Sequence, residues 1–189
     1  MTKGMMLAAG RGTRLGPLTD AMPKPLLPVG NVPVMAHGIA CLRRLGITEI
    51  SANVSYLGEQ ILDAFDDGAA HGVRVQWLYE ATASGTAGGA KRMQRLLGRE
   101  RIVIIAGDAM LDLDLAPLLA AHEAHGAVAS LATIPVDDPS QYGVVVTDAQ
   151  GRILRFQEKP APGTEISRQA NTGIYVFEPA VFERIPPDT

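Results

Sequence analysis

The sequence predicts an α/β protein with a Rossmann-like, mixed and mostly parallel sheet that has helices on both faces. Short runs of apolar and β-branched residues alternate with helical patterns as far as about residue 135. Beyond that point a hairpin pattern replaces the alternation, which predicts a β-hairpin-rich part after the parallel sheet. Without an internal repeat or a Ser/Gly linker, residues 1–189 are expected to form a single domain.

The individual elements follow from hydrophobic spacing and from turn residues. Strand-length runs occur at Met5–Ala9, Ile50–Val54, Val73–Leu78, Ile102–Ala106, Val128–Ile134, Val144–Thr147 and Gly173–Phe177. Helical patterns occur at Val34–Leu45, Leu57–Phe65, Gly88–Leu97 and Leu115–His125. The turn Asp148–Gly151 joins the strand at Val144–Thr147 to a further strand at Arg152–Phe156. Strands that alternate with helices favour parallel pairing in the first part of the chain.

Composition indicates a compact globular protein and excludes several other classes. Hydrophobic residues make up 47% and charged residues 20% of the chain, and the net charge is −3. No basic stripe is present, so nucleic acid is not an expected partner. The apolar run near the N-terminus is too short for a secretory signal or a membrane span, so no membrane association and a cytoplasmic location are expected. The single cysteine, Cys41, has helical spacing from Ile39 and Leu42 and is expected to be a packed thiol.

A glycine loop, Leu7–Leu15, follows the first strand directly. Small residues in such a loop let backbone N–H groups approach a phosphate. The dinucleotide fingerprint and the P-loop both fail on spacing, because Leu15 stands where each would need glycine. Arg14 ends the loop, and Lys24 follows between Pro23 and Pro25, so two cations belong to this region. Taken alone, the pattern fits a tight surface turn as well as a nucleotide site.

A carboxylate follows the buried run Ile102–Ala106, in the sequence Gly107-Asp108. The carboxyl end of a parallel strand is where open α/β sheets bind ligands, and one carboxylate with phosphate oxygens suits Mg²⁺. Asp112 and Asp114 are interpreted as helix-start acids. His122 and His125 have metal-ligand spacing on a helix expected to follow a solvated edge, but no third ligand is near them in sequence.

The glycine loop followed by Pro23-Lys24-Pro25-Leu26 resembles the signature of the sugar-1-phosphate nucleotidyltransferase family. Further similar segments are Ser84–Ala90, Tyr142–Val145, Phe156–Pro160 and Asn171–Phe177, so the resemblance spans about residues 4 to 185. It implies the nucleotide-diphospho-sugar transferase fold and an enzyme that transfers a nucleotidyl group from a nucleoside triphosphate to a hexose 1-phosphate. The products would be an NDP-sugar and pyrophosphate, and Mg²⁺ would be the cofactor.

The resemblance also implies roles for individual residues. Arg14 and Lys24 would be catalytic, and Asp108 would bind the metal. The residues implied to bind the nucleotide are Leu7, Ala8, Ala9, Gly10, Gly12, Thr13, Glu80, Gly85 and Thr86. Those implied to bind the sugar phosphate are Gly143, Glu158, Lys159 and Asn171.

The substrate pair is harder to predict, because a few side chains decide it. The segments Ser84–Lys91, Gly107–Ala109 and Tyr142–Thr147 look closest to the mannose-1-phosphate guanylyltransferase branch, which implies GTP, mannose 1-phosphate and GDP-mannose. A glucose-1-phosphate thymidylyl- or uridylyltransferase is the alternative within the family. A non-catalytic nucleotide-sugar sensing module is the alternative of another class. A dinucleotide-dependent oxidoreductase is disfavoured by Leu15 and by the missing acid at Asn53-Val54.

Family domains usually continue beyond the length seen here, through a segment with a second metal-binding aspartate. The chain is therefore expected to be truncated at its C-terminal end. Homo-oligomers are common in the family, so a homo-oligomer is an open possibility, although the sequence indicates no interface.

Overall fold

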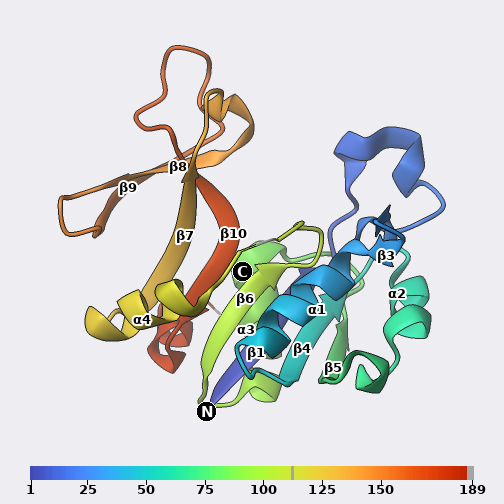
Figure 1. Ribbon diagram of the computed structural model, residues 1–189. Helices are drawn as coiled ribbons and strands as arrows, with labels where there is room; N and C mark the ends of the chain where they lie inside the picture. The colour runs from blue at the N-terminus through green and yellow to red at the C-terminus, as the bar shows by residue number, and fades with distance from the viewer. Residues whose placement is uncertain (112, 187–189) are drawn as a thin grey trace. The chain divides into compact units, whose positions relative to one another are not determined.

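The computed structural model describes residues 1–111 and 113–186 (Figure 1). Two compact units divide the chain. The first unit contains residues 1–130 and the chain from Tyr175 onward, and the second contains Leu131–Ile174.

The first unit contains parallel strands in the order β5-β4-β1-β6, and the last residues of β10, from Tyr175 to Phe177, also belong to it. These strands are β1 (Thr2–Ala8), β4 (Glu49–Val54), β5 (Arg74–Tyr79), β6 (Arg101–Ala106) and β10 (Gln169–Phe177). The α-helices are α1 (Val34–Arg44), α2 (Gly58–Phe65), α3 (Gly85–Leu97) and α4 (Ala116–Ala124). The predicted α/β class with a mostly parallel sheet is confirmed.

Helices cover both faces of this sheet, as consecutive residues of β1 show. Met5 belongs to a buried cluster with Met93 and Leu97 of α3. The next side chain, Met6, points to the opposite face, where its Cε would lie 2.8 Å from a Cβ at Gly38 of α1. Both methionines are fully buried, and Figure 1 shows α1 in front of the sheet and α3 behind it. A central strand that is apolar on both sides therefore holds two helical layers together.

Helix α3 begins at Gly85, earlier than the expected start at Gly88. Its first turn is fixed by Ser84, whose backbone N–H donates to the carboxylate of Glu80 at 3.1 Å. Helix α4 begins near its expected start, with Pro117 in its first turn. The Asp114 carboxylate accepts a hydrogen bond from Ala116 N at 2.9 Å, which confirms the interpretation of Asp114 as a helix-start acid. Asp112 lies outside the described residues.

The second unit contains the predicted hairpin. Strand β8 (Gly143–Thr147) pairs antiparallel with β9 (Ile153–Glu158), and Val145 lies opposite Phe156. Asp148 fixes the turn, because its carboxylate accepts hydrogen bonds from Gln150 N and Arg152 N. Strand β8 also pairs with β10, and β7 (Ala129–Pro135) pairs with β10 as well. Strand β10 begins at Gln169, earlier than expected, because the Ala170 side chain is fully buried and extends the apolar pattern.

Short elements between the first strand and α1 were not predicted. They are the 3-10 helices η1 (Thr13–Thr19) and η2 (Lys24–Leu26) and the small hairpin β2 (Pro28–Val29) and β3 (Val32–Pro33). Further 3-10 helices are η3 (Ala69–His71), η4 (Pro139–Gln141) and η5 (Pro179–Glu183). Such pieces lack hydrophobic periodicity, since one or two turns are too short to show it.

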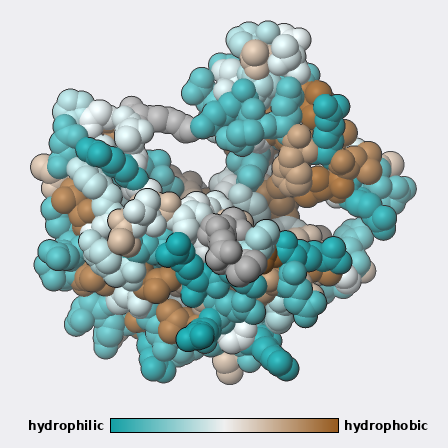
Figure 2. Space-filling view, turned by 180° about the vertical axis from the view of Figure 1, so that it is seen from behind, coloured by the Kyte–Doolittle hydropathy of each residue, from teal (hydrophilic) through white to brown (hydrophobic). Residues whose placement is uncertain are grey.

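Hydrophilic residues predominate on the face seen in Figure 2, with apolar residues in smaller groups, as is usual for a domain in water. In the described part of the chain, each helix is too short or too polar to cross a membrane.

Candidate active site

The carboxyl ends of the parallel strands gather the residues that are predicted to bind the nucleotide. Strand β1 leads into the glycine loop, β5 leads into Glu80, and β6 leads into Gly107 and Asp108. Because these strands are parallel, their carboxyl ends meet at one edge of the sheet. Open α/β sheets bind ligands at this edge, so the first unit has a candidate site where the sequence predicts one.

The end of β6 lies close to the start of the glycine loop. Gly107 N donates to the carbonyl oxygen of Leu7 at 2.8 Å. A Cβ at residue 107 would lie 3.1 Å from that oxygen and 3.1 Å from the Cβ of Ala8, so glycine permits the approach. Ala9 is buried, whereas Gly10 is exposed, and a Cβ at Gly10 would meet no atom within 4 Å. Space for a ligand therefore begins at Gly10.

The turn at Gly12 brings the glycine loop against Lys24. Gly12 has a φ of 69°, and a Cβ there would lie 3.1 Å from the Cβ of Lys24. The hydroxyl of Thr19 closes the turn, because it donates to the carbonyls of Gly12 at 3.3 Å and Gly16 at 3.1 Å. Thr13, the first residue of η1, is exposed beside this turn. A side chain at position 12 would be strained and would push Lys24 away.

Arg14 lies in η1, directly after Gly12 and Thr13. Its side chain is outside the described part of the structure. Gly16 interrupts η1 with a φ of 53° and a ψ of −130°, a conformation that favours glycine. The backbone after Arg14 therefore bends away at a residue with no side chain.

Lys24 and Asp108 form an ion pair across the loop. Lys24 Nζ donates to Asp108 Oδ2 at 2.6 Å. Pro23 and Pro25 are both buried and fix the backbone on either side of the lysine. The two side chains are 32% and 39% exposed, so a ligand can reach both charges. The structure thus brings together the predicted catalytic lysine and the predicted metal ligand.

A buried polar network lies under the loop and contains Asn53, a residue that the sequence analysis did not assign to the site. Its Oδ1 accepts a hydrogen bond from Ala8 N at 3.1 Å, and its Nδ2 donates to Glu80 Oε1 at 3.5 Å. Glu80 is only 2% exposed, and both of its carboxylate oxygens accept hydrogen bonds from Ser84. In this structure Glu80 positions the loop and α3. The signal in the sequence that could have identified Asn53 is a polar amide side chain within a strand that is expected to be buried, since such a side chain needs hydrogen-bond partners.

The start of α3 faces the same network. Gly85 has a φ of 72°, and both Gly85 and Thr86 are exposed. A Cβ at Gly89 would lie 2.8 Å from Asn53 Nδ2, so glycine lets α3 approach β4 closely. The predicted nucleotide-binding residues of α3 therefore share a rigid support with the glycine loop.

The second unit gathers the residues that are predicted to bind the sugar phosphate. Gly143 lies opposite Glu158, and a Cβ at Gly143 would lie 2.8 Å from Glu158 Oε2 and 4.0 Å from Asn171 Cβ. Lys159 has a φ of 40°, and its N–H donates to the carbonyl of Tyr142 at 3.0 Å. The Glu158 carboxylate is 75% exposed and lies 3.7 Å from Lys159 Nζ. The four predicted residues thus converge within this unit, with one in the strained left-handed conformation.

The chemistry of the first site fits a magnesium ion in part. Among the described residues no group of three His, Cys, Asp or Glu side chains is placed to hold a metal. Asp108 supplies one exposed carboxylate beside the glycine loop. Mg²⁺ commonly takes one or two protein carboxylates and completes its shell with phosphate oxygens and water. Asp108 is therefore a suitable single ligand for a metal that arrives with a triphosphate.

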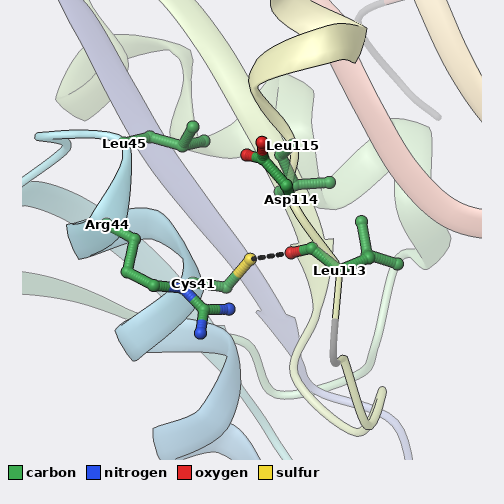
Figure 3. Close-up of a pocket in the computed structure, with 6 residues that line it drawn as sticks. All are labelled: Cys41, Arg44, Leu45, Leu113, Asp114 and Leu115. Carbon is green, nitrogen blue, oxygen red and sulfur yellow. Dashed lines mark hydrogen bonds between the residues drawn. The ribbon is translucent and has the colours of Figure 1, made fainter.

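A cavity of about 300 Å³ lies away from this edge, between the end of α1 and the chain before α4 (Figure 3). It is lined by Cys41, Arg44, Leu45, Leu113, Asp114 and Leu115. Cys41 is 2% exposed, and its thiol donates to the carbonyl of Leu113 at 3.6 Å, as expected for a packed cysteine. The cavity shares no residue with the candidate site.

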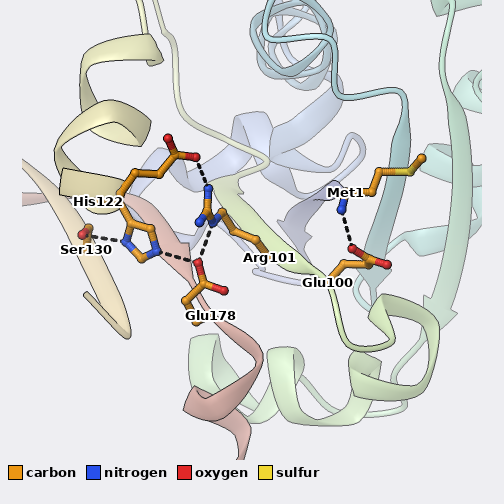
Figure 4. A network of polar contacts seen from close by, with 7 residues as sticks. Met1, Glu100, Arg101, His122, Ser130 and Glu178 are labelled. Atoms are coloured by element: carbon orange, nitrogen blue, oxygen red, sulfur yellow. Dashed lines mark hydrogen bonds and ion pairs between the residues drawn. The ribbon is translucent and has the colours of Figure 1, made fainter. Parts of the chain in front are cut away.

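A polar network surrounds His122 near the amino end of β6 (Figure 4). His122 is 1% exposed, although its helix was expected to follow a solvated edge. Its ring nitrogens lie 2.9 Å from Ser130 Oγ and 3.1 Å from Glu178 Oε1. Arg101 Nε donates to the same Glu178 oxygen at 2.6 Å, and Arg101 Nη1 pairs with Glu123. The histidine is a buried hydrogen-bonding residue, which explains its place on α4 without a metal.

The network shifts the pKa values of two of its members. Burial alone would raise the pKa of Glu178, but the hydrogen bonds from Arg101 and His122 together lower it. The hydrogen bonds to Glu178 and Glu123 raise the pKa of Arg101. Both shifts favour the charged forms of Glu178 and Arg101, and these two residues line, with Met1, part of a second cavity.

A parallel sheet with a glycine loop after its first strand and a Lys–Asp pair at its carboxyl edge is typical of α/β proteins that bind phosphorylated ligands. The model of the nucleotidyl transferase family matches residues 3–188. The chain belongs to this family, which confirms the resemblance inferred from its motifs.

Known relatives cover nearly all of this chain. UTP–glucose-1-phosphate uridylyltransferase of Synechocystis is 43% identical over 97% of the chain and 51% of its own length. Mannose-1-phosphate guanylyltransferase of Mycobacterium tuberculosis is 36% identical over 96% of the chain and 50% of its own length. A crystal structure from Bacillus anthracis, assigned as a glucose-1-phosphate thymidylyltransferase in complex with sucrose, superposes with a TM-score of 0.89 at 30% identity. That match covers 97% of this chain and 74% of the other.

The chain thus spans about half the length of the curated relatives that it matches. Relatives with different nucleotides and sugars in their names match across the same region.

Proposed function

We propose that this chain carries the nucleotidyl-transfer site of a sugar-1-phosphate nucleotidyltransferase. The observation that carries the proposal is the Lys24–Asp108 ion pair beside the glycine loop, at the carboxyl edge of the parallel sheet. One cation and one anion thus lie next to a glycine-rich backbone that a phosphate could approach closely. Membership of the nucleotidyl transferase family supports the same reaction class.

The chemistry in this proposal is in-line displacement. A phosphate oxygen of a hexose 1-phosphate attacks the α-phosphorus of a nucleoside triphosphate, and the bond to pyrophosphate breaks as the new P–O bond forms. Such a reaction needs positioning and charge neutralisation more than a protein nucleophile. The glycine loop would hold the triphosphate, and Arg14 and Lys24 would stabilise charge on the α-phosphate and on the departing pyrophosphate.

The remaining residues of the first unit would bind and orient the nucleotide. Leu7 to Gly10 with Gly12 and Thr13 would line the phosphates, and Gly85 and Thr86 would face the base. Glu80 would act through Ser84 and Asn53, because its carboxylate is buried and bonded to both. Asp108 would hold Mg²⁺, which when bound neutralises charge on the phosphate oxygens.

In the second unit, Lys159 would bind the sugar phosphate. Glu158 and Asn171 would hydrogen-bond to sugar hydroxyls, and Gly143 would leave room for Glu158. The left-handed backbone at Lys159 supports this role, since strained residues of this kind gather at functional sites.

Two substrate pairs have specific support. The segments after β5, β6 and η4 favour GTP with mannose 1-phosphate, and several mannose-1-phosphate guanylyltransferases match the chain at 33% to 37% identity. The 43% identity to a UTP–glucose-1-phosphate uridylyltransferase favours UTP with glucose 1-phosphate. The two pairs define the comparison that the first assay must make.

The test is pyrophosphate release by the purified chain with Mg²⁺. GTP, dTTP, UTP, CTP and ATP are each combined with mannose 1-phosphate and with glucose 1-phosphate. Release that depends on one sugar phosphate and one triphosphate establishes the transferase and identifies both substrates. If no combination releases pyrophosphate while nucleotide binding is still measurable by calorimetry, this chain by itself is not a transferase, and a truncated domain or a nucleotide-sugar sensing module is favoured.

A further inference from the structure

The segment from Arg11 to Met22, called the 11–22 segment below, is the most exposed part of the candidate site. Leu18 is 64% exposed and Met22 is 40% exposed, whereas Thr19 is 3% exposed. The Thr19 hydroxyl donates to the carbonyls of Gly12 and Gly16, which belong to the same segment. A segment with so little apolar burial has a low free energy of local opening unless other residues hold it.

Two side chains from the start of α2 hold this segment. Tyr56 Oη donates to the carbonyl of Asp20 at 3.1 Å, and Gln60 Nε2 donates to the carbonyl of Ala21 at 3.1 Å. The Arg11 guanidinium lies over the Tyr56 ring, 4.8 Å from its centroid. These contacts fix the segment at both ends, close after Gly10 and close before Pro23.

The backbone between these two side chains is itself unusual. Leu57 lies between Tyr56 and α2 with a φ of 49° and a ψ of 31°, a conformation that leucine rarely adopts. The turn lets the chain leave β4 and enter α2 within a few residues. It also leaves Tyr56 and Gln60 on the same side, facing the 11–22 segment. An unfavourable leucine conformation at this point indicates that the direction of these side chains matters.

We propose that Tyr56 and Gln60 are positioning residues that latch the 11–22 segment in the shape that binds the nucleoside triphosphate. The inference rests on the proposed function, because it assigns the latch to that nucleotide site. The latch holds the turn at Gly12 and the backbone of η1 in place before the ligand arrives. A binding-competent shape that is populated more of the time raises the apparent affinity in proportion. The latch therefore acts on nucleotide affinity and leaves the sugar phosphate unaffected.

Trypsin provides a test that does not need enzyme activity, because Arg11 and Arg14 are cleavage points inside the latched region. The double variant Tyr56→Leu/Gln60→Ala is compared with the wild type by mass spectrometry of early digests. We expect cleavage after Arg11 and Arg14 to be about tenfold faster, since both hydrogen bonds and the ring contact are lost. Tyr56→Phe keeps the ring and is expected to give about a threefold increase.

The matched control is Asp63→Ala, which changes an exposed residue on the same helix. We expect cleavage and nucleotide affinity of this control to match the wild type. The Kd of the triphosphate identified by the substrate panel is then measured for each protein by calorimetry. We expect the double variant to bind it about tenfold more weakly, with the KM for the sugar phosphate unchanged. Tyr56→Phe should recover most of the affinity.

Each outcome has one meaning. Unchanged cleavage in the double variant overturns the latch, because the segment is then held by other contacts. Faster cleavage with unchanged nucleotide affinity overturns the positioning role and leaves a structural one. A different result contradicts the proposed function itself. In that case the wild type binds none of the five triphosphates, and none of the triphosphates protects Arg11 and Arg14 from trypsin. The single variant Gln60→Ala repeats the test if the double variant does not fold.

Discussion

Lys24 Nζ lies 2.6 Å from Asp108 Oδ2, although 84 positions of sequence separate the two residues. The pair neutralises the two charges that the proposed reaction would use separately. Binding of a triphosphate with Mg²⁺ would replace this one contact by two, ammonium to phosphate and carboxylate to metal. In the proposed site the pair would therefore couple nucleotide binding to metal binding.

Lys24→Met tests this coupling from the lysine side. We expect turnover to fall about 100- to 1,000-fold, because a preorganised cation at the phosphates contributes about 3–4 kcal/mol. We also expect the variant to bind Mg²⁺ more tightly than the wild type when nucleotide is absent, since Asp108 loses its partner. Pyrophosphate release and calorimetric Mg²⁺ titration measure the two effects. Near wild-type turnover in Lys24→Met would remove Lys24 from the mechanism, and Lys24→Arg serves as the charge-conserving control.

Gly10→Ala separates ligand binding from folding. The added Cβ would meet no protein atom within 4 Å, and Gly10 does not have a positive φ, so the free energy of unfolding should not fall. If backbone N–H groups at Gly10 approach a phosphate, the methyl group will weaken triphosphate binding about tenfold. Urea denaturation and nucleotide titration check the two parts. Unchanged nucleotide affinity in a stable variant argues against a phosphate beside Gly10.

Glu80→Gln tests the buried network under the glycine loop. The amide keeps one accepting oxygen and replaces the other by an NH2 group, so a donor would face either Ser84 N or Asn53 Nδ2, which are donors themselves. We expect the free energy of unfolding to fall by about 1–3 kcal/mol, since a buried donor is left unsatisfied. Urea denaturation measures the loss, and Glu183→Gln is an exposed control. A stability equal to that of the wild type would show that the network is dispensable.

The polar network around Glu178 predicts a pH dependence of stability. The pKa of Glu178 is lowered in the folded state by Arg101 and His122, against the effect of burial. Its contribution is therefore complete above the ordinary value of 4.5 and is lost as the pH falls through the lower folded value. Glu178→Gln should be less stable than the wild type at neutral pH, and the difference should shrink below pH 4.5. Thermal unfolding across this range checks it, with Glu59→Gln as the control. A difference that stays constant with pH contradicts this account.

Much of the fold was predictable because hydrophobic periodicity reports burial. The strands of the parallel sheet, the helices α1 to α4 and the hairpin all appear near their expected positions. The early start of α3 at Gly85 was not predictable, because it depends on the hydrogen bond from Ser84 to Glu80. The 3-10 turns after the glycine loop carry no periodic signal.

The site was predictable to the extent that its residues belong to local motifs. The place of Asp108 followed from the expected end of β6, and that of Lys24 from the glycine-loop motif, but the ion pair between them was not predicted. Asn53 was missed, because the sequence shows only an amide side chain in a strand. Its hydrogen-bond partners are Ala8 at the end of β1 and Glu80 just after β5. Tyr56 and Gln60 carry no motif, since their role depends on the left-handed turn at Leu57. Contacts between elements distant in sequence thus decide which polar residues support the site.

The reverse reaction, pyrophosphorolysis, tests the proposed nucleotidyl-transfer site most directly when wild type and Lys24→Met are measured side by side. GDP-mannose and UDP-glucose are each incubated with pyrophosphate and Mg²⁺, and formation of the nucleoside triphosphate is followed by chromatography. We expect the wild type to form GTP or UTP from one of them and Lys24→Met to form it at least about 100-fold more slowly. Equal rates for the two proteins, or no triphosphate from any nucleotide sugar, would contradict a nucleotidyl-transfer site at Lys24 and Asp108.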